Sequence, residues 1–395
     1  LPEREPRHRR AAPRLVGRRV AIVGAALSDI GRVDTKTPFE LHFQATSRAI
    51  ADAGLTKADI DGFGSSGMGI LPPVEVAEYL GLRPTWADGT GVGGSTWEFM
   101  VGHAAAAIAE GQAEVVVLVY GSTARADLKA RRRGANLSFG ARGPVQFDVP
   151  FGHTLISKYA MAARRHMHEY GTTIEQLAEI AVSSRYNASL NPEAYYRDLI
   201  TIDDVQSSRM MADPLTKLHC CIRSDGGGAV VLTSEDRARD LAKQPVWVLG
   251  TGETVDHTTM SEWEDFTVSP ALRSGHLAFE RAGVTPADID LCQIYDAFTP
   301  MVLLTFEALG FCGKGEAGPF VEDGKMRVGG ALPTNTDGGG LSHCHPGMRG
   351  MFLLVEAVRQ LRREAHGRQV ENANLCCVHG TGGWFSSAST VILGI

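Results

Sequence analysis

The sequence predicts an α/β fold built from two copies of one unit, and two repeated segments indicate the duplication. The nine residues 53–61, AGLTKADID, return at 282–290 as AGVTPADID with seven positions identical. The strand-like segments VAIVG at 20–24 and VWVLG at 246–250 lie upstream of the two copies. Solenoid repeats are tens of residues long, whereas this one returns after 229 residues. The repeat therefore indicates a duplicated domain.

Each half is expected to alternate strands and helices. Apolar runs of four to six residues, each followed by a helix, favour strands that are buried on both faces, with helices outside them. In the first half we expect, in order, a strand at 19–24, a helix at 39–53, Thr56 as the N-cap of 58–60, a Gly-rich turn at 91–95, a helix at 96–110 and a strand at 115–120.

The second half is expected to repeat this order. Its predicted elements are a strand from 246, a helix at 272–282, a strand at 291–294, a Gly-rich turn at 338–340, a helix at 351–363 and strands at 374–378 and 389–393. We expect a basic, disordered leader at 1–18, an N-terminal half at 19–240 and a C-terminal half at 244–395.

Composition limits the classes of function. The chain has 39 Lys and Arg against 45 Asp and Glu, a net charge of -6, which gives no indication of nucleic-acid binding. No apolar run approaches the roughly 18 residues of a membrane span. The seven cysteines are odd in number and include two adjacent pairs, which makes a poor disulfide framework. A reducing cytoplasm is therefore the expected compartment.

The segment at about 121–221 has no counterpart in the second half and is expected to form an inserted loop domain. It contains a charged stretch at 125–133 and a predicted helix at 157–170 that carries Arg164 and Arg165. These basic residues have two interpretations, contact with substrate phosphates or solvated helix surface, and we favour the second. His166 and His168 point to different helix faces and no CxxC is present, so no metal site is predicted.

Several motifs, taken in their order and spacing, resemble the thiolase superfamily. They are the inserted loop domain, a Gly-rich turn before a helix in each half, RRHMHEYGTT at 164–173, SDGGGAVVL at 224–232, YDAF at 295–298, GGGLSHCHPG at 338–347 and HGTGG at 379–383. The chain is most similar to the sterol-carrier-protein thiolases and lipid-transfer-protein-type homologues. This resemblance implies a five-layered α-β-α-β-α fold and substrates that are acyl-CoA esters.

The chain departs from the family at the nucleophile. Thiolases use a cysteine at the turn before the buried helix of the first half, where the helix N-terminus lowers the thiol pKa. The resemblance places Gly91 at that position, and no cysteine precedes Cys220. Ser95 is a conceivable replacement, but a serine at a helix start is more often an N-cap. The usual acyl-enzyme intermediate therefore cannot form at Gly91.

A second departure is Tyr295, which stands where thiolases have the asparagine of NEAF. A tyrosine at the end of a buried strand is often a packed ring whose hydroxyl is hydrogen-bonded. At this position the resemblance favours a functional role, because homologues with the same substitution are steroid side-chain aldolases. A phenol with a pKa near 10 can exchange a proton with an alcohol when neighbouring donors stabilise its oxyanion.

The remaining site is partly retained. His345 matches the histidine of the thiolase GHP motif, with Cys344 in place of the glycine. The family's acid/base cysteine falls near Cys376 or Cys377, although inert burial on an apolar strand explains these two equally well. His379 is a further candidate for the pocket. From the Gly-rich turns we expect substrate contacts at Gly91, Gly93, Ser95, Gly340 and Gly382.

Retro-aldol cleavage of a β-hydroxyacyl-CoA fits these residues best. It needs a base, which Tyr295 can supply, and an enolate-stabilising donor, which His345 can supply. It also needs an acid, for which Cys344 and His379 are the candidates. The alternatives are thiolase-type acyl transfer through an unusual cysteine, and a non-catalytic lipid or acyl-CoA carrier.

The resemblance also implies assembly and substrate type. It implies a steroid side-chain ester as the substrate, with CoA as part of it and no separately bound cofactor. It implies a homodimer and a small OB-fold partner that covers the site.

Overall fold

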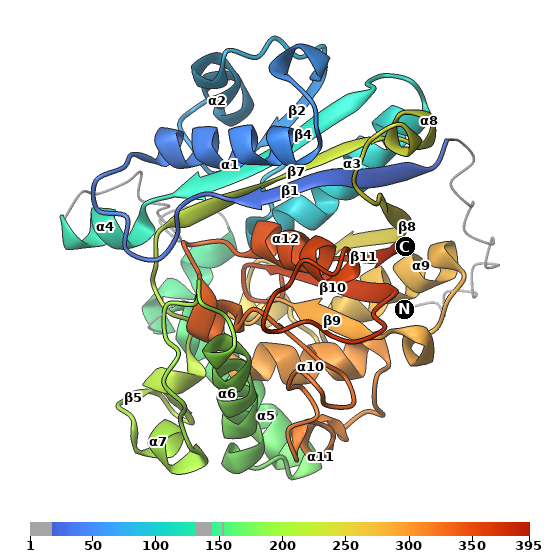
Figure 1. The fold of residues 1–395 in the computed structure, drawn as a ribbon. Helices are drawn as coiled ribbons and strands as arrows, with labels where there is room; N and C mark the ends of the chain where they lie inside the picture. Colours follow the sequence, from blue (N-terminus) through green and yellow to red (C-terminus); the bar gives the residue numbers. More distant parts are fainter. Residues whose placement is uncertain (1–17, 131–143, 152–153) are drawn as a thin grey trace, which may run out of the picture.

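The computed structural model describes residues 18–130, 144–151 and 154–395 (Figure 1). Nine strands form one twisted sheet in the order β3-β2-β4-β7-β1-β8-β11-β10-β9. Their bounds are β1 Val20–Leu27, β2 Gly62–Ser65, β3 Trp86–Asp88, β4 Val115–Ser122, β7 Gly226–Ser234, β8 Val246–Val255, β9 Leu291–Ile294, β10 Leu375–Gly382 and β11 Ser387–Gly394. A separate small ribbon pairs β5 Met210–Ala212 with β6 Leu215–Thr216.

Helices cover the outer faces of this sheet and also pack between its two ends. Their bounds are α1 Pro38–Asp52, α2 Pro72–Leu80, α3 Thr96–Ala109, α4 Ala124–Lys129, α5 Leu155–Tyr170, α6 Ile174–Ser189, α7 Ile202–Ser207, α8 Glu235–Arg239, α9 Ala271–Ala282, α10 Thr299–Leu309, α11 Ala317–Val321 and α12 Gly350–Leu361. The strands and helices expected in both halves are present. Their ends differ from the sequence expectation by a few residues, chiefly because β1, β8, β10 and β11 extend further.

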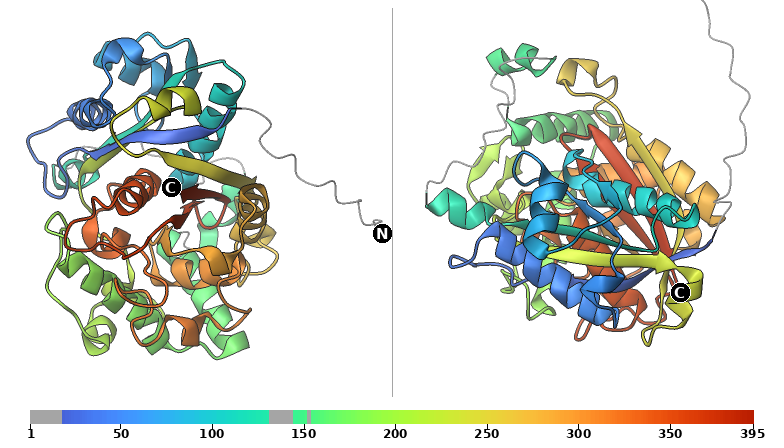
Figure 2. Two further views of the ribbon diagram at one scale, coloured as in Figure 1. Left: turned by 45° about the vertical axis from the view of Figure 1, so that its right-hand side comes forward. Right: turned by 90° about the horizontal axis from the view of Figure 1, so that it is seen from above.

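The predicted five layers are observed. Helices α1 and α2 cover the outer face of β1, β2, β4 and β7, while α9 covers β8 and β11, with α10 beside it. Helices α3 and α12 contact strands from both ends of the sheet, so they form the central layer (Figures 1 and 2). The two sets of strands meet where β1 pairs with β8 over Ala21 and Ile22.

The repeated sequence makes the same local contacts twice. Asp59 accepts hydrogen bonds from the backbone N–H and the hydroxyl of Thr56 at 2.8 and 2.7 Å. Asp288 accepts the same two bonds from Thr285, at the same two distances. Each carboxylate satisfies the first backbone donor of a short 3₁₀ turn, as predicted for Thr56.

The last aspartate of each copy holds the start of a distant strand. Asp61 accepts from the backbone N–H of Glu114 and Val115, where β4 begins. Asp290 accepts from the backbone N–H of Asn374 and Leu375, where β10 begins. The two copies of the repeat therefore satisfy equivalent backbone donors in the two halves.

A glycine in each upstream strand sets the distance between helix and sheet. A β-carbon at Gly24 would lie 2.2 Å from the carbonyl oxygen of Ala49 in α1. A β-carbon at Gly250 would lie 2.2 Å from that of Ala278 in α9. Only glycine permits this close approach, so the strand motif VxxxG and the helix behind it form one unit.

The inserted segment packs α5, α6 and α7 beneath the second half. Arg164 and Arg165 are half exposed and pair with Asp213 and Glu169, as expected of a solvated surface. His166 differs from that expectation, because it is buried and hydrogen-bonds Thr172 and Glu307. Residues 1–17 of the predicted basic leader at 1–18, and residues 131–133 of the charged stretch at 125–133, lie outside the described residues.

No helix among the described residues has both the length and the apolarity needed to cross a bilayer.

Candidate active site

Tyr295 follows the last residue of β9 and lies between the two halves. Its backbone N–H donates to the carbonyl of His379 at 2.9 Å, which extends the pairing of β9 with β10. A β-carbon at Gly94 would lie 2.3 Å from the tyrosine ring, so only glycine fits at this point before α3. The ring is 5% exposed. The first half therefore contributes Gly94, which packs against the ring, and the second half contributes the phenol of Tyr295.

The phenol of Tyr295 and the imidazole of His345, two of the predicted site residues, lie next to each other. The Tyr295 hydroxyl lies 3.1 Å from Nε2 of His345, within hydrogen-bond range. The two rings meet edge to face, with centroids 5.6 Å apart and an interplanar angle of 87°. His345 is 8% exposed, so the pair sits in a nearly dry environment. The donor of this bond depends on the histidine tautomer.

Burial keeps both members of the pair neutral. It raises the pKa of Tyr295 well above 10, with a smaller opposing effect from the backbone N–H of Arg349. It lowers the pKa of His345 to about 4, and the nearby Arg349 guanidinium adds to that lowering. At neutral pH the site therefore holds a protonated phenol and a neutral imidazole.

The loop that carries His345 is held by Asp296, the residue after Tyr295. Its carboxylate accepts from the backbone N–H of Gly340 at 2.7 Å and of Leu341 at 3.3 Å. These residues belong to the π-helical turn Gly339–His343. Burial raises the pKa of Asp296 to about 7, against the lowering effect of Arg349. Tyr295 is thus joined to the loop that carries His345 through the adjacent residue, Asp296.

Arg349 completes the frame from the residue before α12. Its guanidinium is fully buried and donates to both carboxylate oxygens of Asp337, at 2.6 and 2.7 Å. It also donates to the carbonyl of Cys344 and lies 3.3 Å from Asp296. His343 hydrogen-bonds Asp337 from the other side at 2.7 Å. Paired and hydrogen-bonded in this way, the buried charges fix the loop around His345.

Two first-half residues fix the loop on its other side. Ser224 accepts a hydrogen bond from the backbone N–H of His345 at 2.8 Å. The hydroxyl of Tyr120 donates to the carbonyl of Pro346 at 2.6 Å. His345 is therefore anchored on both sides along the chain.

The other predicted acid/base residues have different partners. The Cys344 thiol lies 3.2 Å from Ser224 Oγ, and burial raises its pKa to about 12. His379 hydrogen-bonds Thr390 at 2.9 Å and Thr381 at 3.3 Å, and burial lowers its pKa to about 3. Each thus has its hydrogen bonds satisfied away from the Tyr295 hydroxyl.

The adjacent cysteines of β10 are fully buried. Cys377 stands opposite Cys292 in the pairing of β10 with β9. Burial raises the pKa of Cys376 well above 9, and the carboxylate of Glu356 in α12 contributes. These surroundings fit the interpretation of inert burial better than that of an acid/base group.

The predicted glycine contacts divide into two groups. A β-carbon at Gly340 would lie 3.0 Å from the His345 ring, so this glycine borders the pair. Gly93 and Gly382 pack against each other where the turn before α3 meets the end of β10. Among the described residues, a β-carbon at Gly91 would have only Ser66 Oγ within 4 Å, so a small side chain has room at this position.

Ser95 is the N-cap residue of α3, but its hydroxyl does not cap the helix. The hydroxyl instead lies 2.8 Å from Ser387 Oγ and is fully buried. The expected capping bond is therefore wrong, because the β10–β11 hairpin offers a closer partner.

The sequence reasoning missed Asp296, Asp337, Arg349 and Glu98. The first three lie within or beside the motifs YDAF and GGGLSHCHPG, so their proximity to the site was visible in the sequence. Their pairing was not, because Arg349 lies 12 positions after Asp337 and 53 positions after Asp296 in the sequence. Glu98 lies on an apolar helix that gave no functional signal.

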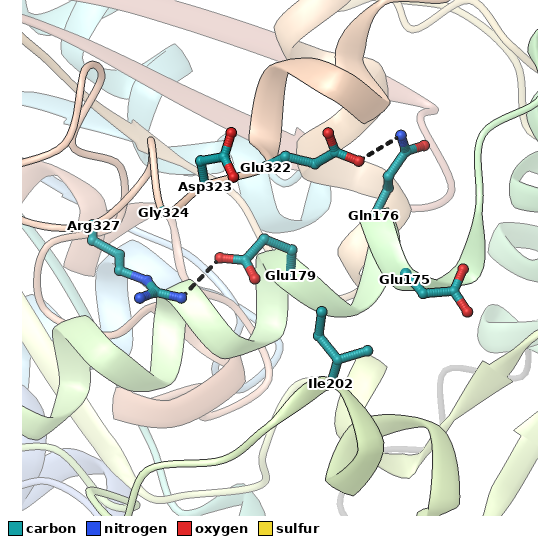
Figure 3. Close-up of a pocket in the computed structure, with 8 residues that line it drawn as sticks. All are labelled: Glu175, Gln176, Glu179, Ile202, Glu322, Asp323, Gly324 and Arg327. Atoms are coloured by element: carbon teal, nitrogen blue, oxygen red, sulfur yellow. Dashed lines mark hydrogen bonds and ion pairs between the residues drawn. The ribbon is translucent and has the colours of Figure 1, made fainter.

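A separate hollow of about 510 Å³ lies between α6 and the segment after α11 (Figure 3). Four carboxylates and Arg327 line it, together with Gln176, Ile202 and Gly324. Gln176 bonds Glu322 and Arg327 bonds Glu179, as the close-up shows. An anionic CoA would be repelled by this lining, and none of the predicted site residues contributes to it.

Comparison with known proteins agrees with this geometry. Residues 252–395 match the family model described as thiolase C-terminal domain-like. The chain is 36% identical over 373 residues to the steroid side-chain-cleaving aldolase of Thermomonospora curvata, covering 92% of this chain and 95% of that protein. It is 37% identical to the 17-hydroxy-3-oxo-4-pregnene-20-carboxyl-CoA lyase of Mycobacterium tuberculosis, covering 87% and 91%.

Other relatives extend the comparison. The chain is 33% identical to an acetyl-CoA acetyltransferase of Methanothermobacter thermautotrophicus, covering 95% of this chain and 99% of that protein. Its fold superposes on the solved Ltp2-ChsH2(DUF35) aldolase with a TM-score of 0.85 and 34% identity, covering 95% and 97% of the two chains. The chain belongs to the thiolase superfamily, in its lipid-transfer-type branch.

The buried ion pair gives a first prediction. Replacing Asp337 with Asn should lower the free energy of unfolding by about 3–5 kcal/mol, because it leaves the Arg349 charge buried without its partner. Burial opposes ionisation of Asp337, but Arg349 and His343 outweigh it and hold its pKa below 3.8. This stabilisation is present above about pH 4 and is lost as the pH falls further. Urea unfolding at pH 7 and pH 3 measures both effects.

The exposed Asp323→Asn serves as the control and should change stability by less than about 0.5 kcal/mol. If the two variants unfolded alike at pH 7, Asp337 would not be the partner that Arg349 depends on.

Proposed function

We propose that the protein is a thiolase-like aldolase, a C–C lyase that cleaves a β-hydroxyacyl-CoA by a retro-aldol reaction. The observation that carries this proposal is the Tyr295–His345 pair, at 3.1 Å, in a site whose nucleophile position is Gly91. Such a pair can move protons, whereas no acyl-cysteine can form at a glycine. The names of the aldolase and lyase relatives support the same chemistry.

The reaction begins with proton transfer to Tyr295. The substrate β-hydroxyl gives its proton to the phenol oxygen while the phenol proton moves to Nε2 of His345. The C–C bond then breaks, the hydroxyl carbon becomes a ketone, and the electron pair is delocalised into the thioester as an enolate. The imidazolium of His345 returns one proton to the enolate carbon. The products are a ketone and a shorter acyl-CoA, and both side chains end neutral.

The shifted pKa values make this relay depend on the substrate. The pKa of Tyr295 is raised and that of His345 is lowered, so transfer of the phenol proton to the imidazole is unfavourable while the site is empty. The imidazolium becomes favourable when the enolate develops beside it, because opposite charges attract strongly in a site of low dielectric. The charge on His345 is therefore greatest at the step that needs it.

The second candidate function is acyl transfer, which the acetyltransferase relative supports. It would require a reactive thiolate on one of the buried cysteines. Burial raises the pKa of Cys344 to about 12, and its thiol already contacts Ser224. A buried neutral thiol is a poor nucleophile, so the aldolase proposal is preferred. A non-catalytic carrier role does not explain why the polar side chains of Tyr295 and His345 are buried together at 3.1 Å.

We propose a steroid side-chain CoA ester as the substrate, supported by the names of two relatives that are 36% and 37% identical and cover 92% and 87% of this chain. CoA then enters as part of the substrate, and the proton chemistry derived above requires no other cofactor. A small OB-fold partner that covers the site is part of this proposal, supported by the DUF35 protein named with the solved aldolase. The seven free cysteines fit a reducing cytoplasm.

The nature of the reaction gives a second prediction. Incubation with a β-hydroxyacyl-CoA should yield a ketone and a shorter acyl-CoA in equal amounts by mass spectrometry. The rate should be the same with and without added free CoA, and it should survive treatment with iodoacetamide. An acyl group trapped on Cys344, Cys376 or Cys377 would instead establish acyl transfer.

A third prediction concerns the tyrosine hydroxyl. Tyr295→Phe keeps the ring against Gly94 and should cost only about 1 kcal/mol of stability for one hydrogen bond. Because the hydroxyl carries the proton, kcat should fall by about 10²-fold or more. Substrate binding should change far less, since the proton moves only in the transition state. Unaltered turnover would assign Tyr295 to packing and leave His345 as the base.

A fourth prediction concerns assembly. We propose a homodimer with two-fold symmetry, supported by strand β3, which lies at one edge of the sheet and, within the described part of the chain, pairs with β2 alone. Sedimentation at micromolar concentration should give about twice the chain mass of 42.4 kDa. A single species at the chain mass would contradict this.

A further inference from the structure

Glu98 is a buried carboxyl group without a partner at the centre of the molecule. It occupies the third position of α3, one helical turn after Gly94, and is 0% exposed. Neither carboxylate oxygen has a hydrogen-bond partner among the described residues. Buried carboxyl groups are normally paired, so one without a partner requires an explanation.

Two glycines from the second half make room for this carboxyl. A β-carbon at Gly350, the first residue of α12, would lie 2.4 Å from Glu98 Oε2. A β-carbon at Gly380 in β10 would lie 2.3 Å from the same oxygen. Three segments that are distant in sequence therefore enclose the carboxyl, and any larger side chain at either glycine would fill its place.

A second polar atom without a partner faces the same space. Ser389 in β11 pairs with Gly380 across the ladder, so their side-chain positions lie on the same face of the sheet. The Ser389 hydroxyl is buried and, among the described residues, has no hydrogen-bond partner. The glycines, Glu98 and Ser389 thus surround one small buried region, here called the chamber, beside the buried hydroxyls of Ser95 and Ser387.

This chamber adjoins Tyr295. The backbone N–H of Arg349 partly opposes the rise in the pKa of Tyr295. The next residue, Gly350, borders Glu98. Gly94 touches the tyrosine ring, and its carbonyl also lies against Gly350. The carboxyl and the phenol are therefore neighbours around the start of α12.

We infer that Glu98 is a positioning residue of the site, held as a neutral carboxylic acid behind Tyr295, and that its ionisation stops the tyrosine from acting as a base. Ionised Glu98 would place a negative charge beside the phenol in a medium of low dielectric. That charge would oppose the partial negative charge on the phenol oxygen while its proton moves to His345, and the negative charge of the enolate that forms next. This inference rests on the proposed function, because it acts through the tyrosine base.

The groups around Glu98 do not stabilise its charge. Burial raises the pKa of Glu98 to about 8, and only its own backbone N–H opposes this. The Arg349 guanidinium is turned to Asp337 and Asp296, and His379 is bonded to Thr390 and Thr381. Tyr295 and His345 are neutral between about pH 5 and pH 9. Asp296 is the other nearby group that titrates near neutrality, at about 7.

The test is the pH profile of the Glu98→Gln variant. The amide matches the neutral acid in shape and cannot ionise. Wild-type kcat should fall by about 10-fold for each pH unit above about 8, whereas Glu98→Gln should keep its turnover at pH 9.5. The exposed Glu110→Gln, on the residue that ends the same helix, should retain the wild-type profile. A Glu98→Gln enzyme with the wild-type alkaline fall would overturn the inference.

A second measurement is independent of catalysis. Because the folded pKa lies above the usual 4.5, the unfolded chain ionises first, and Glu98 costs the fold stability as the pH rises from about 4.5 to 8. The Tm of wild type should therefore fall relative to that of Glu98→Gln over this range. The protonated-carboxyl infrared band at pH 7 should contain a contribution from Glu98 that is lost in the variant, beside the contribution of Asp296, which stays.

The two measurements separate the two proposals. If the Glu98 contribution to the band and the Tm shift are present but no retro-aldol product forms, the proposed function fails while the neutral Glu98 stands. If product forms and that contribution is absent at pH 7, Glu98 is ionised and the inference fails.

Discussion

The active site depends on the buried ion pair of Arg349 and Asp337. Arg349 reaches Asp337, Asp296 and the carbonyl of Cys344 at once, so one guanidinium joins the strand that carries Tyr295 to the loop that carries His345. Removing these charges from water costs several kcal/mol per ion, which only close pairing and further hydrogen bonds offset. The same network therefore leaves the loop little freedom, and the 3.1 Å distance between base and partner follows from it.

The electrostatics of the site follow from burial combined with this single cation. Burial moves Tyr295, His345, Asp296 and Glu98 towards their neutral forms. Asp337 alone is held firmly ionised, because it receives the guanidinium directly. The site is thus close to neutral apart from one paired charge, and a charge that forms during the reaction is weakly screened. Such a site suits a reaction that creates an enolate and then removes it.

The sequence predicted the fold well where a pattern was local. The repeated nonapeptide, the two strand glycines and the helix at Ala271–Ala282 depend on contacts within one unit, and all are present. Tyr295 and His345 were each named as site residues through the family resemblance, whereas their contact is seen only in the structure. The bond from Ser95 to Ser387 and the chamber around Glu98 were not predictable, because each joins residues nearly 300 positions apart. A single sequence contains no signal for such contacts.

The two halves contribute differently to the site. Tyr295, His345 and the Arg349 network all belong to the second half, whereas Gly94, Ser224 and Tyr120 come from the first and only contact them. The two similar halves thus have different roles in the site: the second contributes the polar side chains, and the first packs against them. Substitutions in the first half away from Glu98, Ser224 and Tyr120 can reshape the walls around the substrate without altering the Tyr295–His345 pair. The fold can therefore acquire new substrates by changing one half while the chemistry of the other is preserved.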